Sequence, residues 1–256
     1  MNRILAANWK MNLTLAEAKT LFASYAEARA LYPSISIIAF PPFTALASIA
    51  EMRRAGGPAL GAQNCHAEPR GALTGEISAE QIRDVGAEYV LVCHSERRRL
   101  FCESDATARA KLGAAWRAGL TPLLCIGETL AERERSETRA ILTRQLERAL
   151  ESAPPRSRLL VAYEPVWAIG TGVVATTEQV AESHGWIREI LQAIGRMDKS
   201  GPTPVLYGGS VDPKNAPALS ALGEVDGFLV GGASLTAPSF LAIAGAQDRA
   251  GATRAG

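Results

Sequence analysis

Several side chains and glycine pairs in this sequence have the chemistry of a catalytic site. Glu164 could act as a general base, and His94 could donate a hydrogen bond or carry a proton. Lys10 could stabilise negative charge that develops during a reaction. The pairs Gly208-Gly209 and Gly231-Gly232 leave backbone amides unshielded, which suits an oxyanion or a phosphate. If the fold brings them to one place, a base, a neutral donor, a cation and a phosphate cradle indicate a shared function.

The carboxylate of Glu164 begins the stretch EPVWAIGTG, which ends at Gly172 and is almost entirely apolar after its first residue. Proline and glycine on both sides of Trp167 indicate a loop. An apolar loop beside a carboxylate can exclude water and so raise the basicity of that carboxylate. The stretch is therefore predicted to cover a reacting group.

Each of these residues also has an ordinary structural explanation. Lys10 could be a solvated surface cation, since lysine is mostly exposed in proteins. His94 could cap the turn that follows it, and Glu164 could pair with a basic neighbour. The glycine pairs could form two tight turns. The position of each residue in the fold has to decide between these explanations and a catalytic site.

Short runs rich in Val, Ile and Leu alternate along the chain with longer amphipathic stretches, eight of each. The predicted strands cover residues 4–7, 35–40, 59–63, 89–93, 123–126, 159–163, 205–207 and 227–230. A helical stretch follows each strand, and the clearest one, over 131–152, places its leucines on one face and Arg and Glu on the others.

These strands are continuously apolar, which predicts burial on both faces, as in parallel strands covered by helices. Eight such units in 256 residues predict the α/β class and a closed (β/α)8 barrel with outer helices. We expect one catalytic domain over residues 1–246 and a short polar tail over 247–256. An open doubly wound sheet is the alternative, but no GxGxxG follows the first strand and no GxxxxGKS/T occurs.

In a closed (β/α)8 barrel, catalytic residues lie at the carboxyl ends of the strands, where the connecting loops meet. The polar residues and glycines at these positions are Asn8 and Lys10 after the first strand, His94 after the fourth, Glu164 after the sixth, Gly208, Gly209 and Ser210 after the seventh, and Gly231 and Gly232 after the eighth. The barrel would therefore collect these groups at one rim.

The overall composition is that of an ordinary globular protein. Apolar residues make up 47% of the chain and the net charge is +1, so no nucleic-acid or membrane partner is implied. The apolar run at the amino terminus is too short for a secretory signal. A cytoplasmic location is therefore predicted by default. The four cysteines are expected to be reduced thiols. No spacing of His, Cys and carboxylates suggests a metal.

Six motifs lie at or near the predicted strand ends: AANWKMN at 6–12, CHSERR at 93–98, CIGE at 125–128, YEPVWAIGTG at 163–172, YGGSV at 207–211, and the segment 226–235. Together they resemble the triosephosphate isomerase family over nearly the whole chain. The resemblance implies a TIM barrel that interconverts dihydroxyacetone phosphate and D-glyceraldehyde 3-phosphate through an enediolate. No metal and no organic cofactor are expected, because only a proton moves.

The resemblance also implies a role for each catalytic side chain. Glu164 takes the carbon-bound proton, while His94, as a neutral imidazole, polarises the carbonyl and moves protons between the oxygens. A helix beginning directly after His94 would disfavour the imidazolium. Lys10 stabilises negative charge, and Asn8 holds the same edge of the substrate. Glu96 is implied as a partner that fixes this basic neighbourhood.

In the family, the stretch from Glu164 to Gly172 is a lid that closes over the substrate, with Trp167 packing the closed lid. Closure would protect the enediolate from water and from loss of its phosphate group. The resemblance assigns phosphate binding to Gly170, Ser210, Gly231 and Gly232.

A loop of about a dozen residues, 64–75, follows the third predicted strand and is longer than compact domains usually contain without a function. In the family this loop inserts into a neighbouring subunit, with Thr74 reaching toward that subunit's site. The resemblance therefore implies a homodimer.

Two positions differ from the common pattern of the family. Cys93 precedes His94 where Gly is usual and could crowd the end of the fourth strand. Val173 follows the lid where Lys is usual, and a β-branched residue could alter lid kinetics. Substrate preference therefore stays open. The alternatives are an isomerase acting on a tetrulose phosphate, a Schiff-base aldolase, and a non-catalytic sugar-phosphate binder.

Overall fold

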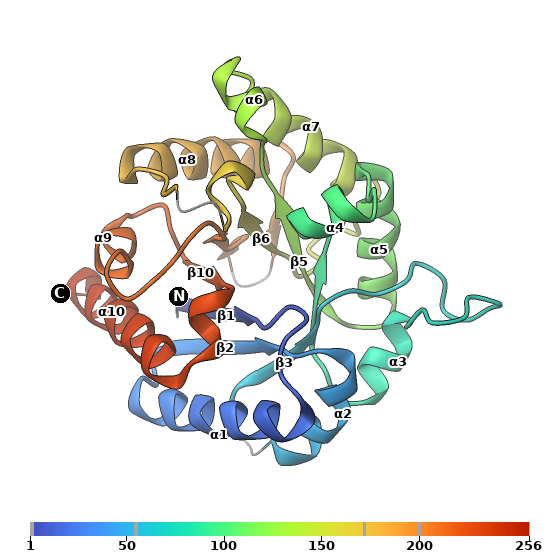
Figure 1. The fold of residues 1–256 in the computed structure, drawn as a ribbon. Helices are drawn as coiled ribbons and strands as arrows, with labels where there is room; N and C mark the ends of the chain where they lie inside the picture. The colour runs from blue at the N-terminus through green and yellow to red at the C-terminus, as the bar shows by residue number, and fades with distance from the viewer. Residues whose placement is uncertain (1–2, 54–55, 171–172, 199–200, 256) are drawn as a thin grey trace.

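The computed structural model describes residues 3–53, 56–170, 173–198 and 201–255. Its eight barrel strands are β1 (Arg3–Asn8), β2 (Ile35–Phe40), β3 (Ala59–Ala62), β4 (Tyr89–Val92), β5 (Thr121–Ile126), β6 (Leu160–Tyr163), β9 (Val205–Tyr207) and β10 (Gly227–Val230). All pairs are parallel, and the sheet closes because β1 pairs with both β2 and β10 (Figure 1). The predicted (β/α)8 barrel is confirmed.

Helices form a ring outside the strands (Figure 1). Within the described residues they are α1 (Leu15–Leu31), α2 (Phe43–Met52), α3 (Ala79–Asp84), α4 (Ser95–Leu100), α5 (Asp105–Arg117), α6 (Leu130–Glu134), α7 (Thr138–Leu150), α8 (Thr177–Ala193), α9 (Ala216–Ala221) and α10 (Ala237–Ala255), with the 3-10 helices η1 (Val166–Ala168) and η2 (Gly232–Leu235). Two short strands that the sequence did not predict, β7 (Met197–Asp198) and β8 (Gly201–Pro202), form an antiparallel pair apart from the barrel.

The barrel strands are buried on both faces, as their apolar runs predicted. Ile4 of β1 packs among the side chains inside the barrel, whereas its neighbour Leu5 packs with the surrounding helices. Phe40 fills part of the interior, and Gly61 makes room for it, since a Cβ at Gly61 would lie 2.2 Å from the Phe40 ring. The interior is therefore a packed core that fixes the strand ends and the loops that leave them.

The single helix predicted over residues 131–152 is wrong, because the segment forms two helices, α6 and α7. Between them Ser136 has a φ of +58°, a left-handed conformation that ends an α-helix. At the start of α6, Thr129 and Glu132 form a capping box that satisfies free backbone amides. Residues 132–139 are all polar, so the apolar period begins only in α7 and gives no sign of where the helix breaks.

The end of the chain differs from the polar tail predicted over 247–256. Helix α10 continues to Ala255, and alanine, the strongest helix former, recurs through this segment. Gln247 is fully buried, with Nε2 3.5 Å from the carbonyl oxygen of Ile4. The first residue of the expected tail therefore packs against β1.

The described residues contain no helix long and apolar enough to cross a bilayer. The cysteines are unpaired, as predicted: Cys65, Cys93 and Cys125 are buried and Cys102 is exposed.

A fully buried histidine on α8, His184, predicts a specific loss of stability in acid. Its ring packs near Tyr163 and Tyr207, and its Nδ1 lies 3.2 Å from the carbonyl oxygen of Glu224. Burial lowers the pKa of His184 from 6.5 to about 3. The unfolded chain takes up a proton below its ordinary pKa, whereas the folded chain does so only near pH 3. Acid therefore favours unfolding between these two values.

We expect the free energy of unfolding of the wild type to fall relative to that of His184→Asn by about 1.4 kcal/mol per pH unit between about pH 6 and about pH 4. Asparagine keeps a donor for the Glu224 carbonyl oxygen but does not titrate. Urea unfolding of both proteins at several pH values and one protein concentration measures the difference. A difference that stays constant with pH would contradict the assignment.

Candidate active site

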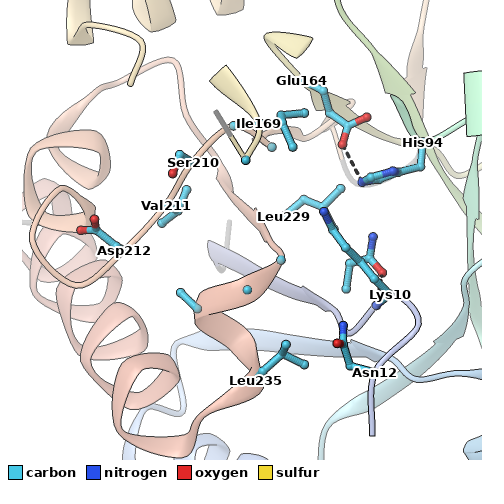
Figure 2. A pocket seen from close by; sticks show the side chains of 17 residues that line it. Lys10, Asn12, His94, Glu164, Ile169, Ser210, Val211, Asp212, Leu229 and Leu235 are labelled. Atoms are coloured by element: carbon cyan, nitrogen blue, oxygen red, sulfur yellow. Dashed lines mark hydrogen bonds and ion pairs between the residues drawn. The ribbon is translucent and has the colours of Figure 1, made fainter. Parts of the chain in front are cut away.

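A pocket of about 440 Å³ opens at the carboxyl ends of the barrel strands (Figure 2). It is lined by Asn8, Lys10, Asn12, His94, Glu164, Ile169, Gly170, Gly208, Gly209, Ser210, Val211, Asp212, Leu229, Gly231, Gly232, Ala233 and Leu235. These residues belong to β1, to β10, and to the loops that follow β1, β4, β6, β9 and β10. The pocket therefore lies at the rim that the strand order predicted.

The structure brings most of the predicted site residues together. Those that line the pocket are Asn8, Lys10, His94, Glu164, Gly170, Ser210, Gly231 and Gly232. Glu96 and Trp167 do not line it, but Glu96 bonds to Lys10 and Trp167 lies in the same stretch as Gly170. Thr74 is exposed on the loop after β3 and does not reach the pocket of its own chain. The functional role of each residue stays a prediction.

Glu164 and His94 are in direct contact (Figure 2). His94 Nε2 lies 2.9 Å from Glu164 Oε1, and the backbone N–H of Ser95 donates to Glu164 Oε2 at 2.8 Å. His94 immediately precedes α4, and its Nδ1 accepts the backbone N–H of Glu96 at 3.2 Å. Because Nδ1 is an acceptor, the partners assign the ring proton to Nε2, as in the neutral imidazole.

These contacts govern how the two groups titrate in this arrangement. Burial opposes ionisation of Glu164, but His94 and the Ser95 N–H stabilise the anion, and the pKa of Glu164 is lowered from its ordinary value. Burial opposes protonation of His94, but the Glu164 carboxylate outweighs it, and the pKa of His94 is raised. The prediction that Glu164 has raised basicity is therefore wrong for this arrangement. The contacts with His94 and Ser95 lower the pKa of Glu164 by more than burial raises it.

Lys10 is oriented by contacts at both its backbone and its ammonium group. Its Nζ pairs with Glu96 Oε1 at 2.7 Å, and its backbone N–H donates to Asn8 Oδ1 at 3.0 Å. A Cβ at Gly231 would lie 3.2 Å from Lys10 Cε, so a side chain there would crowd the lysine. Because the Lys10 and Glu96 side chains are 29% and 37% exposed, their ion pair adds little to stability and mainly sets orientation.

Two consecutive glycines, Gly208 and Gly209, form the rim of the pocket directly after β9. A Cβ at Gly208 would lie 2.9 Å from Glu164 Cγ, and a Cβ at Gly209 would lie 2.2 Å from Tyr207 Oη. On the stretch that follows β6, Gly170 has a φ of +68°, a conformation that favours glycine. Gly208 and Gly209 therefore make room for Glu164 and Tyr207, and the Gly208 N–H is used in a bond to the Tyr163 carbonyl oxygen at 2.7 Å. Of these three glycines, Gly208 has no free amide for an anion, whereas the unshielded backbone at Gly170 has the property that a phosphate cradle needs.

The predicted lid stretch is attached to a fully buried carboxylate, that of Glu128. Glu128 Oε1 accepts hydrogen bonds from Trp167 Nε1 at 2.9 Å, Tyr163 Oη at 3.0 Å and Arg133 at 3.2 Å. The Arg133 guanidinium also lies over the Trp167 ring at 5.2 Å. Thr171 and Gly172, the end of the predicted lid, lie outside the described residues. Closure of this stretch stays a prediction.

Sequence reasoning gave no role to several residues that shape this site. Glu128 has no role beyond the CIGE motif in the sequence analysis, although a carboxylate two residues after an apolar strand is an available signal. The backbone amide of Ser95 has no signature in a sequence, because any residue could supply it. Leu229, inside β10, lines the pocket but has the pattern of an ordinary core residue.

Cys93, directly before His94, is fully buried and has a φ of +54°. Left-handed backbone costs a residue with a side chain roughly 1–2 kcal/mol. Burial raises the pKa of the Cys93 thiol to about 12, so the thiol stays protonated. The side chain therefore strains the turn that places His94 and adds no nucleophile to the site.

Cys93→Gly is expected to be more stable than Cys93→Ala by roughly 0.5–1 kcal/mol. Both variants remove the thiol, but only glycine relieves the left-handed strain, and its greater freedom in the unfolded chain offsets part of that gain. Urea unfolding of the two variants side by side measures the difference. If the alanine variant were equally or more stable, the turn would carry no such strain.

The fold and the pocket define a barrel enzyme whose site suits proton transfer on an anionic substrate. Residues 3–247 match the family model described as Triosephosphate isomerase. The sequence is 48% identical over 244 residues to the triosephosphate isomerase of Xanthobacter autotrophicus, covering 94% of this chain and 95% of that one. It is 46% identical over 244 residues to that of Bdellovibrio bacteriovorus, covering 95% and 99%. The crystal structure of triosephosphate isomerase from Bartonella henselae matches with a TM-score of 0.87 and 39% identity, covering 96% of this chain and 99% of that chain.

The chain belongs to the triosephosphate isomerase family, a family of aldose–ketose isomerases. The family that the six motifs predicted is therefore confirmed. None of the relatives named above favours a tetrulose phosphate isomerase, a Schiff-base aldolase or a non-catalytic binder.

Proposed function

We propose that this chain interconverts dihydroxyacetone phosphate and D-glyceraldehyde 3-phosphate by moving a proton between adjacent carbons through an enediolate. The observation that carries the proposal is the 2.9 Å contact between His94 Nε2 and Glu164 Oε1, in a pocket that Lys10 also lines. The reaction needs a base for the carbon-bound proton and a donor for the neighbouring oxygen, and this pair supplies both. Only a proton moves, so no metal or organic cofactor is required.

Glu164 takes the proton from the carbon next to the carbonyl, and the electron pair of that C–H bond forms the double bond of the enediolate. A proton then returns to the adjacent carbon, so the atoms of substrate and product balance. To take this proton, the Glu164 carboxylate leaves its contacts with Ser95 and His94 and contacts the substrate instead. Its burial persists while the partners that stabilise its anion are lost, so its pKa rises when the base is needed.

His94 donates its Nε2–H to the enediolate oxygen as a neutral imidazole and moves a proton between the two oxygens. The Glu96 N–H bonded to Nδ1 at 3.2 Å supports this tautomer. Burial opposes protonation of the ring, and the Glu164 carboxylate is the main influence that raises its pKa. Once Glu164 turns to the substrate, burial and the helix amide both favour the uncharged ring.

Lys10 supplies positive charge to the oxygens and the phosphate, and Asn8 holds the same edge of the substrate. The phosphate is bound by backbone at Gly170, Ser210, Gly231 and Gly232, all of which line the pocket. The stretch from Glu164 closes over the substrate as a lid with Trp167 packed into it. Closure excludes water, which strengthens these electrostatic contacts and keeps the enediolate from losing its phosphate.

A coupled assay tests the reaction, with D-glyceraldehyde 3-phosphate and a tetrulose phosphate offered in parallel to the purified protein. We expect rapid turnover of the triose phosphate. Preference for the four-carbon substrate would keep the mechanism and change the substrate, and no turnover of either would contradict an isomerase. Borohydride added with substrate should label no lysine, whereas a Schiff-base enzyme would be labelled.

Assembly as a homodimer and a cytoplasmic location are part of the proposal. Met11 is 96% exposed and Phe101 is 62% exposed, so this single chain presents large apolar side chains to solvent that a second copy could cover. Thr74 is also exposed, on the loop expected to enter the partner. Sedimentation equilibrium at micromolar concentration distinguishes a species of twice the chain mass from a monomer, and a monomer would contradict the dimer.

A further inference from the structure

The backbone of Lys10 is held in a conformation that a lysine does not adopt by preference. Its φ is +51°, in the left-handed region that costs a residue with a side chain roughly 1–2 kcal/mol. Such strain persists only where the surrounding structure over-determines the backbone. The contacts of the Lys10 main chain therefore fix the point and direction from which its side chain starts.

Two side chains bond to that main chain, one at each end of the residue. Asn8 Oδ1 accepts the Lys10 N–H at 3.0 Å. The side-chain amide of Gln63 donates to the Lys10 carbonyl oxygen at 2.8 Å. The same Gln63 nitrogen donates to the carbonyl oxygen of Phe40 at 2.9 Å. The two hydrogens of the Gln63 amide group therefore bond to carbonyl oxygens at the ends of two neighbouring strands.

The three segments joined by this amide are consecutive around the barrel. Gln63 directly follows β3, Phe40 ends β2, and Lys10 follows β1. Phe40 is also tied to the first strand, because its carbonyl oxygen accepts the Trp9 N–H at 3.2 Å. Gln63 is partly buried and does not line the pocket, so it has no direct access to a substrate there.

We propose that Gln63 is a positioning residue for the isomerase reaction: by holding the Lys10 carbonyl from β3, it keeps Lys10 left-handed and its ammonium group in the pocket. Glu96 restrains the same ammonium group at 2.7 Å, but only at the end of a flexible chain. Gln63 fixes the backbone from which that chain starts. The inference rests on the proposed role of Lys10 and goes beyond it by naming what aims the lysine.

Gln63→Met tests the proposal, because methionine has nearly the same length and no hydrogen-bond donor. We expect kcat/KM for D-glyceraldehyde 3-phosphate to fall about 10- to 100-fold, as a displacement on the order of 1 Å of a catalytic group does. A residue that only supports the fold could produce a similar loss. The decisive measurement is therefore the same substitution in a Lys10→Met background, which forms a double-mutant cycle.

If Gln63 acts through Lys10, Gln63→Met costs less than about twofold in kcat/KM once the ammonium group is gone. A loss of equal size in both backgrounds would overturn the proposal, and so would wild-type kcat/KM in Gln63→Met. Should Lys10→Met itself retain full activity, the proposed role of Lys10 would fail, and with it this inference. Loss in Lys10→Met without loss in Gln63→Met would remove the inference alone.

Gln247→Met is the matched control. Gln247 is also a glutamine whose side-chain amide lies by a β1 carbonyl, that of Ile4, but at the amino end of the strand. The Gln247→Met variant should have a lower unfolding temperature than the wild type and an unchanged kcat/KM. Equal falls in kcat/KM for the Gln63 and Gln247 variants would mean that any lost anchor of β1 impairs catalysis, which would overturn a specific role for Gln63.

Discussion

Glu164→Asp is expected to lower kcat for D-glyceraldehyde 3-phosphate by about 100- to 1,000-fold, with a much smaller change in KM. The substitution keeps the charge and the chemistry of the base and draws the carboxylate back by one methylene. Proton abstraction from carbon requires the reacting atoms to approach closely, and a misplacement on the order of 1 Å is enough to cost about 100-fold. Substrate binding relies mainly on other residues of the pocket, so kcat should carry most of the loss.

Steady-state kinetics of the purified variant measure the effect, and its unfolding temperature shows whether the fold is intact. Glu189→Asp is the matched control, because it makes the same change at a surface residue whose carboxylate pairs with Arg139 at 2.9 Å. That control should have wild-type kcat. A Glu164→Asp enzyme within about tenfold of wild type would exclude Glu164 as the base.

His94→Gln is expected to lower kcat/KM by about 100- to 1,000-fold, the range found when a positioned proton donor or an oxyanion donor is removed. Glutamine can still donate one hydrogen bond, but it cannot move a proton between the two oxygens. It also loses the ring nitrogen that accepts the Glu96 N–H at 3.2 Å. The loss should therefore exceed that of a single missing hydrogen bond.

The pH dependence of the wild type distinguishes a neutral from a charged His94. A neutral ring keeps its proton at Nε2 throughout the neutral range, so kcat should change little between about pH 7 and about pH 9. An imidazolium would lose its extra proton as the pH rose through its pKa, and kcat would fall tenfold per pH unit above that value. Such a fall within this range would contradict the neutral mechanism.

The parts of this molecule that the sequence predicted are those that local patterns determine. All eight barrel strands are buried on both faces, so continuous apolar runs were enough to find them. The break at Ser136 has no signal in the sequence pattern, because the residues on both sides of it, 132–139, are all polar and carry no apolar period. The β7–β8 pair was missed because each strand is only two residues long.

The site was predictable as a set of residue types and not as a set of contacts. Strand order placed Lys10, His94 and Glu164 at one rim, and the pocket contains all three. The direction of the Glu164 pKa was missed because it depends on contacts with His94 and with the backbone N–H of Ser95, which is 69 residues away in the sequence. The left-handed φ of Lys10 and its bond to Gln63 likewise depend on tertiary contacts that no local pattern encodes.

The pairing of β1 with β10 makes synthesis of the chain and folding of the barrel interdependent. The first strand emerges from the ribosome early, yet one of its two hydrogen-bonding edges waits for a strand that begins at Gly227. Closure there is tight, because a Cβ at Gly227 would lie 1.9 Å from the carbonyl oxygen of Ile4. Until β10 is made, the nascent sheet has an unpaired edge open to wrong partners. Pairing of β1 with β10 is therefore a non-local contact, of the kind that generally forms slowly and leaves time for aggregation.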